Sequence, residues 1–451
     1  MRDSAATTGT ERGLGPHLPP EDRPAADGAF FTAALDYTPV TETQEYRVVG
    51  LVSGSHVVNH AYLVALAPVI GTVASEFGVS IAAVGLAIGV QGAVVTLLQL
   101  PFGYLSDSRS RTLVLALSLV VGTVGIVATA VAPTYQWLLV SQALLGVGIA
   151  GHHPAQYPLL ATATSEASRG RAYSLHALGG SLGFAVPYAI AAGVDALGFG
   201  WRWSIVVLAV LGAGFSLVAL PLARGFPESI RKPAAEDRPD SRPSISAVRQ
   251  GATDLLASSG LMGLALLSFL TSAAAWCIRT YSPQLLADGY GLLPSTANLL
   301  VSGMLVTGAG MILLGGTLTD RIGPGNVALG GYAALVGLAA LLASGSLPLA
   351  LLVLVLPFSG TISVSRPARS TLADRLSARS DLGKSFAVVT VGISLGGAVA
   401  PPAFGALIDV SGVRVAFGVV AVLGVLSLGM TQWLLGRVDG SARDPKAAAS
   451  D

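Results

Sequence analysis

The chain has 451 residues, of which 52% are hydrophobic and only 11% are charged. An ordinary soluble domain carries about 25% charged residues, so this composition excludes most soluble classes. The net charge of +1 offers no general attraction for nucleic acid. The single cysteine, Cys277, excludes an internal disulfide and a cysteine-based metal site. We therefore predict no nucleic-acid partner, no cofactor and no metal site.

The first segment, residues 1–45, differs from the rest because it is rich in Pro, Gly, Asp, Glu and Thr. It contains no long apolar stretch, so we predict a disordered cytoplasmic tail. It also lacks the basic start and apolar centre of a cleavable signal peptide. We expect the first membrane helix to act as the insertion signal.

Long apolar runs fill most of the remaining chain, and a membrane-spanning helix needs roughly 20 such residues. Two series of six runs predict twelve membrane helices, near residues 47–71, 81–105, 112–132, 136–163, 172–194, 202–223, 258–282, 295–318, 326–344, 348–371, 385–408 and 414–436. These runs define two six-helix bundles, residues 46–224 and 258–437. Segment 225–257, which is rich in proline and charge, is the predicted cytoplasmic linker, and 438–451 is a cytoplasmic tail.

The two series repeat one sequence pattern at a nearly constant distance. The motif Gly-x-Leu-x-Asp occurs at 103–107 and again 213 residues later, at 316–320. At the same shift, Phe-Gly-Val at 77–79 matches Tyr-Gly-Leu at 290–292, and Gly-x-Ser-x-Gly at 179–183 matches 392–396. A constant shift over a whole half indicates two copies of one membrane unit.

Lysine and arginine residues are concentrated in alternate loops. One set of loops holds Arg109, Arg111, Arg169, Arg171, Arg231, Lys232, Arg238, Arg242, Arg249, Arg321, Arg375, Arg379 and Lys384, whereas the opposite set holds little beyond Arg202 and Arg414. The positive-inside rule makes the first set cytoplasmic. We predict a multi-pass plasma-membrane protein with both termini in the cytoplasm.

Several predicted spans contain polar residues, which are costly at membrane depth and usually face a cavity or a partner. His56 and His60 lie one turn apart with Asn59 beside them, and His153 and Gln156 share a face of the fourth span. Arg279 lies in the seventh span and Arg366 in the tenth. His152 points about 100° away from His153, and we predict a helix–helix hydrogen bond for it.

Asp and Glu are absent from these predicted lining runs. Bases without acids favour an anionic substrate. The histidines are then the candidate carriers for proton linkage.

The repeated hinge resembles the loop signature of the major facilitator superfamily, between its second and third helices. That resemblance implies an all-α fold in which two six-helix bundles rock by alternating access. It implies a cytoplasmic gate that includes Gly103, Asp107, Arg111, Gly316, Asp320 and Arg321. It also implies a central cavity lined by helices one, four, seven and ten, which places His56, Asn59, His60, His153, Gln156, Arg279 and Arg366 at a substrate site.

A narrower resemblance rests on the stretch Gly-Val-Gly-Ile-Ala-Gly-His-His-Pro at 146–154. Together with Ser55-His56, Asn59 and Arg169-Gly-Arg171 it is similar to the fosmidomycin-resistance-type branch. That resemblance implies export of small anionic or amphipathic drugs. Gln142 stands where many proton-driven exporters have arginine, and Val186-Pro187 where antiporters have Gly-Pro, which disfavours antiport.

Two motifs of soluble enzymes also match. Gly-x-Gly-x-x-Gly at 146–151 lies inside an apolar run with no strand before it, so we interpret it as tight helix packing. Gly-x-Ser-x-Gly at 179–183 fits a nucleophile elbow, but its duplicate at 392–396 favours packing of symmetric helices. An intramembrane serine hydrolase that uses Ser181 and His176 is a distant alternative.

We predict a transporter and not an enzyme. Because no nucleotide-binding motif is present, we expect an ion or solute gradient to drive transport, which makes it a secondary transporter. It would move a small solute, in the first place an organic anion, with Arg366 and His153 as charge partners and His56 and His60 in proton linkage. Drug efflux is the alternative within this class, and a receptor that signals through 225–257 lies outside it. The expected partners are the substrate and membrane lipid, and we expect a monomer.

Overall fold

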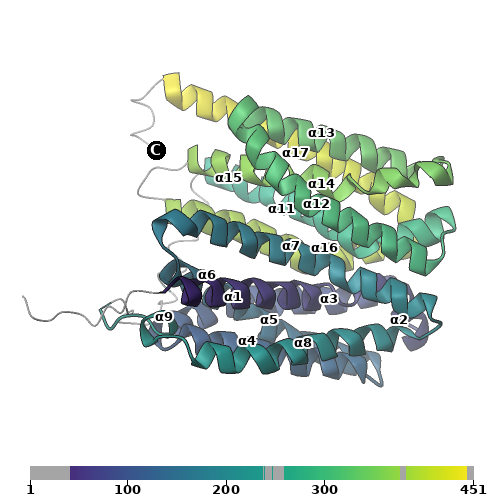
Figure 1. The fold of residues 1–451 in the computed structure, drawn as a ribbon. Coiled ribbons are helices and arrows are strands. Elements are labelled where there is room, and N and C mark those ends of the chain that lie inside the picture. The colour runs from purple at the N-terminus through teal and green to yellow at the C-terminus, as the bar shows by residue number, and fades with distance from the viewer. Residues whose placement is uncertain (1–40, 237, 239–245, 247–258, 376–381, 444–451) are drawn as a thin grey trace, which may run out of the picture. The chain divides into compact units, whose positions relative to one another are not determined.

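The computed structural model describes residues 41–236, 238, 246, 259–375 and 382–443, and nearly all of them are helical (Figure 1). The first half comprises α1 (Glu42–Leu63), η1 (Ala67–Val69), α2 (Ile70–Phe77), α3 (Ile81–Ser108), α4 (Arg111–Ala130), α5 (Tyr135–Ala150), α6 (His152–Ala163), α7 (Glu166–Ala196) and α8 (Trp201–Arg224). After the short α9 (Glu228–Arg231), the second half comprises α11 (Ser259–Gln284), η2 (Leu285–Gly289), α12 (Pro294–Ile322), α13 (Pro324–Ala343), η3 (Leu349–Val355), α14 (Phe358–Ser363), α15 (Ser365–Arg375), α16 (Leu382–Ser411) and α17 (Val413–Arg443).

Eleven stretches of the described residues are long and apolar enough to cross a membrane. The remaining predicted span, 136–163, is divided at Gly151 into α5 and α6. Pro154 explains the break, since proline has no N–H to donate and its ring clashes with the carbonyl four residues earlier. The two short helices together take the place of the fourth span.

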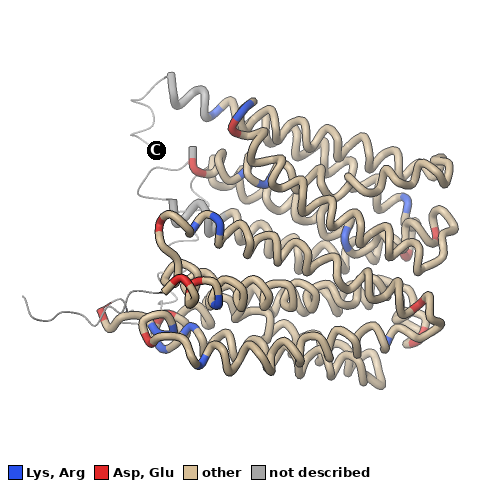
Figure 2. Tube along the Cα trace, in the orientation of Figure 1, with Lys and Arg blue, Asp and Glu red and all other residues tan. Residues whose placement is uncertain are grey.

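The predicted tail boundary lies close to the start of α1, which begins at Glu42 behind a capping box formed by Thr41 and Gln44. Most of segments 1–45, 225–257 and 438–451 lies outside the described residues. Figure 2 shows that charged residues gather at the two ends of the helices, while the middle of the bundle is almost free of them. This distribution suits helices that cross an apolar layer.

The duplication seen in the sequence is present in the backbone. Gly78 and Gly291 both end a helix in the left-handed region, with φ of 62° and 74°. Gly198 and Gly412 form a second such pair, with φ of 77° and 83°. A residue with a side chain is strained at these angles, so matching glycines mark matching turns.

Equivalent arginines also make equivalent contacts in the two halves. Arg202, at the start of α8, bonds to Glu76 at the end of α2. Arg414, at the start of α17, donates to the main-chain oxygen of Gly289 at the end of η2. In each half, an arginine at the start of the last helix therefore bonds to the end of the first membrane span.

The glycine motifs serve helix packing, as predicted. A Cβ atom on Gly148 would overlap the backbone of Gly122 on α4, and one on Gly179 would lie 2.7 Å from the main-chain oxygen of Ser53 on α1. Small residues allow such close backbone approach in membrane bundles. Ser181 donates to Ala177 of its own helix at 2.9 Å.

The two halves meet along two pairs of helices, α3 with α16 and α7 with α12. In Figure 1 the purple-to-teal helices of the first half form one layer and the green-to-yellow helices of the second half form the other. The chain thus places its first and second series of predicted spans in separate bundles that face each other.

We expect Gly148→Ala to destabilise the protein, because the new methyl group would meet the Gly122 backbone, which has no flexible end to move aside. Overpacking of this kind costs about 1–3 kcal/mol. Thermal unfolding of the purified protein in detergent measures the effect. Gly214→Ala on α8 is the matched control, since nothing lies within 4 Å of its Cβ position. Equal unfolding temperatures for the two variants would contradict the proposed packing.

Candidate substrate site

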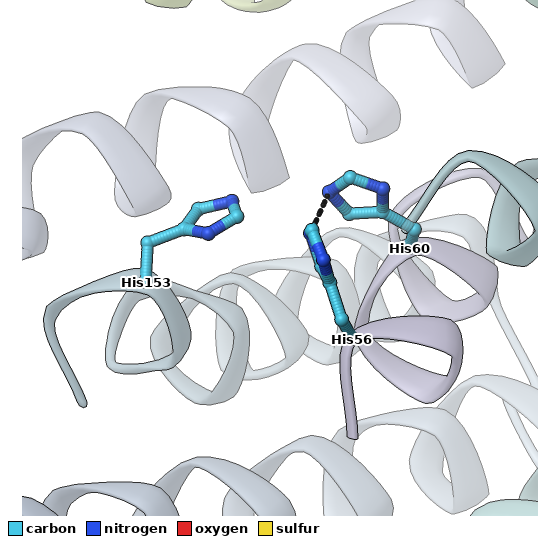
Figure 3. Close-up of side chains that lie close together, drawn as sticks. All are labelled: His56, His60 and His153. Carbon is cyan, nitrogen blue, oxygen red and sulfur yellow. Dashed lines mark hydrogen bonds between the residues drawn. The ribbon is translucent and has the colours of Figure 1, made fainter. Parts of the chain in front are cut away.

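Two histidines on α1 form the centre of the site. The Nδ1 atom of His56 lies 2.8 Å from the main-chain oxygen of His176, and Nδ1 of His60 lies 2.7 Å from that of Gly180. Both carbonyl oxygens belong to α7 and can only accept, so each Nδ1 carries a hydrogen. The two Nε2 atoms then face each other at 3.1 Å (Figure 3).

His153 reaches the same place from the start of α6. Its ring centroid lies 5.0 Å from that of His56 and 5.8 Å from that of His60. Figure 3 shows its ring directed toward the pair on α1. Its Nδ1 atom is buried and has no hydrogen-bond partner among the described residues.

His176 completes the cluster, although the sequence analysis did not place it at the substrate site. Its ring stacks on His56, with centroids 4.1 Å apart and planes 19° apart. Neither of its ring nitrogens has a hydrogen-bond partner within the described chain, so no Ser181–His176 pair of a hydrolase is formed. His56 and His176 are 120 positions apart in the sequence, and no helical spacing predicts a contact over that distance.

A glycine permits this arrangement. A Cβ atom on Gly180 would overlap the imidazole ring of His56. The bare backbone of α7 therefore approaches α1 closely enough for its carbonyls to accept from both histidines.

The side chain of Phe184 lies between Arg279 on α11 and the histidine cluster. The guanidinium carbon of Arg279 lies 4.5 Å from the ring centroid of Phe184, and that ring in turn stacks on His60 at 4.2 Å. Trp276 lies on another side, with its centroid 5.9 Å from the same guanidinium carbon. These contacts are cation–π interactions in a poorly hydrated setting.

Arg366 approaches from α15 in the second half. It interacts electrostatically with Tyr157 and His60 of the first half, and with Arg279. The side chain of Arg366 is exposed and that of Tyr157 is 49% exposed, so neither is sealed by protein. The structure thus brings His56, His60, His153, Arg279 and Arg366 into one polar region shared by the two halves.

The other two predicted substrate residues are held in helix contacts instead. Asn59 is buried and donates to the main-chain oxygen of Ile149 at 3.4 Å. Gln156 is buried and donates to Ser55 Oγ at 2.9 Å. The structure does not bring either amide to the histidine and arginine group.

His152 bridges helices, as predicted. Its Nδ1 lies 2.9 Å from Ser118 Oγ on α4, and its Nε2 lies 2.7 Å from the main-chain oxygen of Ser55 on α1. Both nitrogens are therefore occupied in packing.

The predicted gating residues lie at the end of the bundle that carries most of the basic loops. Arg111 donates within its own half, to Thr162 Oγ1 at 2.8 Å and the Ile230 carbonyl oxygen at 3.2 Å. Asp107, Asp320 and Arg321 are exposed, and nothing lies within 4 Å of the Cβ position at Gly103 or Gly316. A gating role for these residues stays a prediction.

At the opposite end of the bundle, hydrogen bonds join the two halves. The carboxylate of Asp409 on α16 accepts from the backbone N–H groups of Ile81 and Ala82, at 3.0 and 2.8 Å. These groups belong to the first turn of α3, where a helix has free donors and a positive dipole end. Asn298 adds a bond to the Pro68 carbonyl oxygen at 3.1 Å.

A duplicated bundle of membrane helices with polar groups between its halves is typical of membrane transporters. Comparison with known families agrees, since the model of the Major Facilitator Superfamily matches residues 52–263 and 264–450. The chain belongs to this superfamily and is a membrane transporter of a small molecule.

Similar proteins are also found individually. The chain is 26% identical over 398 residues to "Uncharacterized MFS-type transporter YfnC" of Bacillus subtilis (strain 168), covering 85% of this chain and 93% of that one. Its fold is similar to an inward-facing, occupied bacterial homologue of the human lysosomal transporter Spinster, with a TM-score of 0.72, 16% identity, and coverage of 87% and 97%. It is also similar to the nucleoside transporter NupG, with a TM-score of 0.69, 13% identity, and coverage of 87% and 98%. These neighbours support the two-bundle fold.

We expect Asp409→Asn to loosen the junction of the two halves, because the amide replaces a carboxylate that accepts two N–H bonds at a helix N-terminus. Spin labels on Leu197→Cys and Leu293→Cys measure the separation of the two halves, since both positions are exposed, at 73% and 70%. Cys277 is buried and should stay unlabelled. The variant should enlarge the long-distance population.

Asp195→Asn is the matched control, because Asp195 is the repeat counterpart of Asp409 and is exposed. Its distance distribution should equal that of the unmutated background. An unchanged distribution in Asp409→Asn would show that this carboxylate does not hold the two halves together.

Proposed function

We propose that this transporter carries a small organic anion, bound between the two halves by Arg279 and Arg366. The positive-inside rule supports a plasma-membrane orientation with the basic loops and both termini in the cytoplasm. In that orientation, the end where Asp409 bonds to α3 is the outer one. Transport would proceed by alternate opening of the two ends.

The proposal rests on one observation: two arginines interact with each other electrostatically and no carboxylate of the surrounding helices neutralises them. Helices α5, α6 and α11 contain no Asp or Glu, and α15 has only Asp374, next to its last residue. The acids of α1 and α7 lie in the first or last turn of their helices. Like charges that share a cavity raise the local concentration of anions. A bound anion would offset the two positive charges.

The aromatic neighbours support an organic rather than an inorganic anion. Phe184 and Trp276 flank Arg279, and the half-exposed Tyr157 lies near Arg366. Apolar walls with a few convergent polar groups are typical of sites for small organic ligands. A carboxylate or phosphonate attached to an apolar body would fit both features.

Arg366→Gln and Arg279→Gln should each lower anion uptake into proteoliposomes by about tenfold or more. Charge-assisted hydrogen bonds contribute about 1.5–3 kcal/mol, and each 1.4 kcal/mol is a factor of ten in affinity. The measurement is uptake of a panel of labelled carboxylates and phosphonates. A nucleoside serves as the neutral comparator, because one structural neighbour is a nucleoside transporter.

Arg171→Gln is the control, since Arg171 is exposed at the start of α7 and lies away from the site. Arg366→Lys keeps the charge and should retain part of the activity. If both glutamine variants transport every anion as well as the unmutated protein does, the anion site is wrong. Uptake of amphipathic cations instead would support the drug-efflux alternative.

Proton linkage through His56 and His60 stays a prediction, as do the fosmidomycin-resistance-type branch and the monomeric state. The same vesicles test the first of these, by comparing uptake with and without an imposed pH gradient. A gradient that leaves uptake unchanged would contradict proton linkage.

A further inference from the structure

We propose that His56, His60 and His153 form a binding site for a divalent transition-metal ion of the zinc type. The sequence predicted no metal site, and nothing in the family membership assigns one. The proposal concerns the three histidines alone and does not depend on the organic anion proposed above.

The Nε2 atoms of the two histidines on α1 contact each other. Because both Nδ1 atoms donate to carbonyl oxygens, both Nε2 atoms of the neutral rings present lone pairs to each other at 3.1 Å. Two facing lone pairs repel. A cation between them turns this repulsion into attraction, and Zn²⁺ binds imidazole nitrogen at about 2.0–2.1 Å. Two ligands at that distance in a tetrahedral site lie about 3.3 Å apart, close to the separation seen here.

Hydrogen bonds already orient the two histidine rings on α1. Histidine ligands of metals almost always donate their other ring N–H to a carbonyl or carboxylate oxygen, which fixes the tautomer. His56 and His60 do this through the α7 backbone, at 2.8 and 2.7 Å. The stacked ring of His176 further fixes His56. The pair is thus oriented in advance for binding through Nε2.

His153 lies where it can supply a third nitrogen ligand. One ligand atom from each of His56, His60 and His153 lies within 4.8 Å of the others. His153 brings a buried Nδ1 that has no partner in the described part of the chain. In Figure 3 its ring faces the pair across a short gap. A modest rotation of this side chain would close the three donors around one ion.

Imidazole donors select the metal class, since they suit zinc, copper, nickel and cobalt, whereas calcium and magnesium prefer oxygen. Three histidines leave a fourth position open, as in catalytic zinc sites. The charges of Arg279 and Arg366 act on His60 and oppose a dication. We therefore expect an anion or hydroxide in the fourth position, where it offsets both the ion and the arginines.

A single proton is the competing occupant of the cluster. It would join the two Nε2 atoms of His56 and His60, but it would leave Nδ1 of His153 without a partner. A metal ion uses all three side chains, and for this reason the geometry favours it.

Cobalt(II) binding to the full-length protein in detergent tests the site. The protein is purified with an affinity tag that contains no histidine and is then freed of metal with a chelator. We expect one equivalent of Co²⁺ to bind with the intense visible bands of a four-coordinate nitrogen site, and one equivalent of Zn²⁺ to abolish them. His60→Gln and His153→Gln should each bind Co²⁺ about a hundredfold or more weakly, because even an outer-shell partner contributes 10–100-fold to affinity.

His17→Gln is the matched control, since His17 lies in the N-terminal segment and should leave the bands unchanged. Circular dichroism and gel filtration show whether each variant is folded. The two substituted histidines lie on different helices, so one folded variant is enough to test the metal site if the other fails to fold. Absence of stoichiometric Co²⁺ binding by the unmutated protein would overturn the metal site in favour of a proton. Unchanged binding in a folded site variant would overturn it as well. Neither result would alter the anion proposal.

Discussion

Polar groups inside a membrane must find their partners within the protein, because lipid offers no hydrogen bonds. Most of the buried polar side chains obey this constraint by simple helix contacts. His152 is an example, since both of its ring nitrogens are bonded to neighbouring helices. Asn59 and Gln156 obey it in part, because their amide nitrogens donate to neighbouring helices while their amide oxygens have no partner among the described residues. In the histidine cluster, Nδ1 of His153 and both ring nitrogens of His176 have no partner among the described residues.

The contacts that orient the cluster depend on glycine. The bare backbone at Gly180 lets α7 approach α1, so that its carbonyls can accept from His56 and His60. The same device at Gly148 brings α5 against α4. Close approach of backbones replaces the hydrophobic effect as the source of cohesion between membrane helices. Packing and the chemistry of the site therefore rest on the same small residues.

The two halves share a backbone but differ in chemistry. Residues 213 positions after His56 and His60 are Phe269 and Ala273, so the second half has no equivalent pair. His153 has Arg366 as its repeat counterpart. Histidines therefore come from one half and arginines from the other. A ligand that contacts both would bridge the halves, which is where alternating access needs the substrate to sit.

The sequence alone determined the helical membrane fold, the duplication and the family, because apolar length and a constant repeat shift are local or periodic signals. It also made His56, His60, His153, Arg279 and Arg366 candidates for the substrate site, since polar residues stand out within apolar spans. Only the tertiary structure decided that His176 joins the cluster, that the amides of Asn59 and Gln156 donate to neighbouring helices, and that Asp409 bonds to the first turn of α3. These facts depend on which faces of distant helices meet, and no spacing along one helix encodes that.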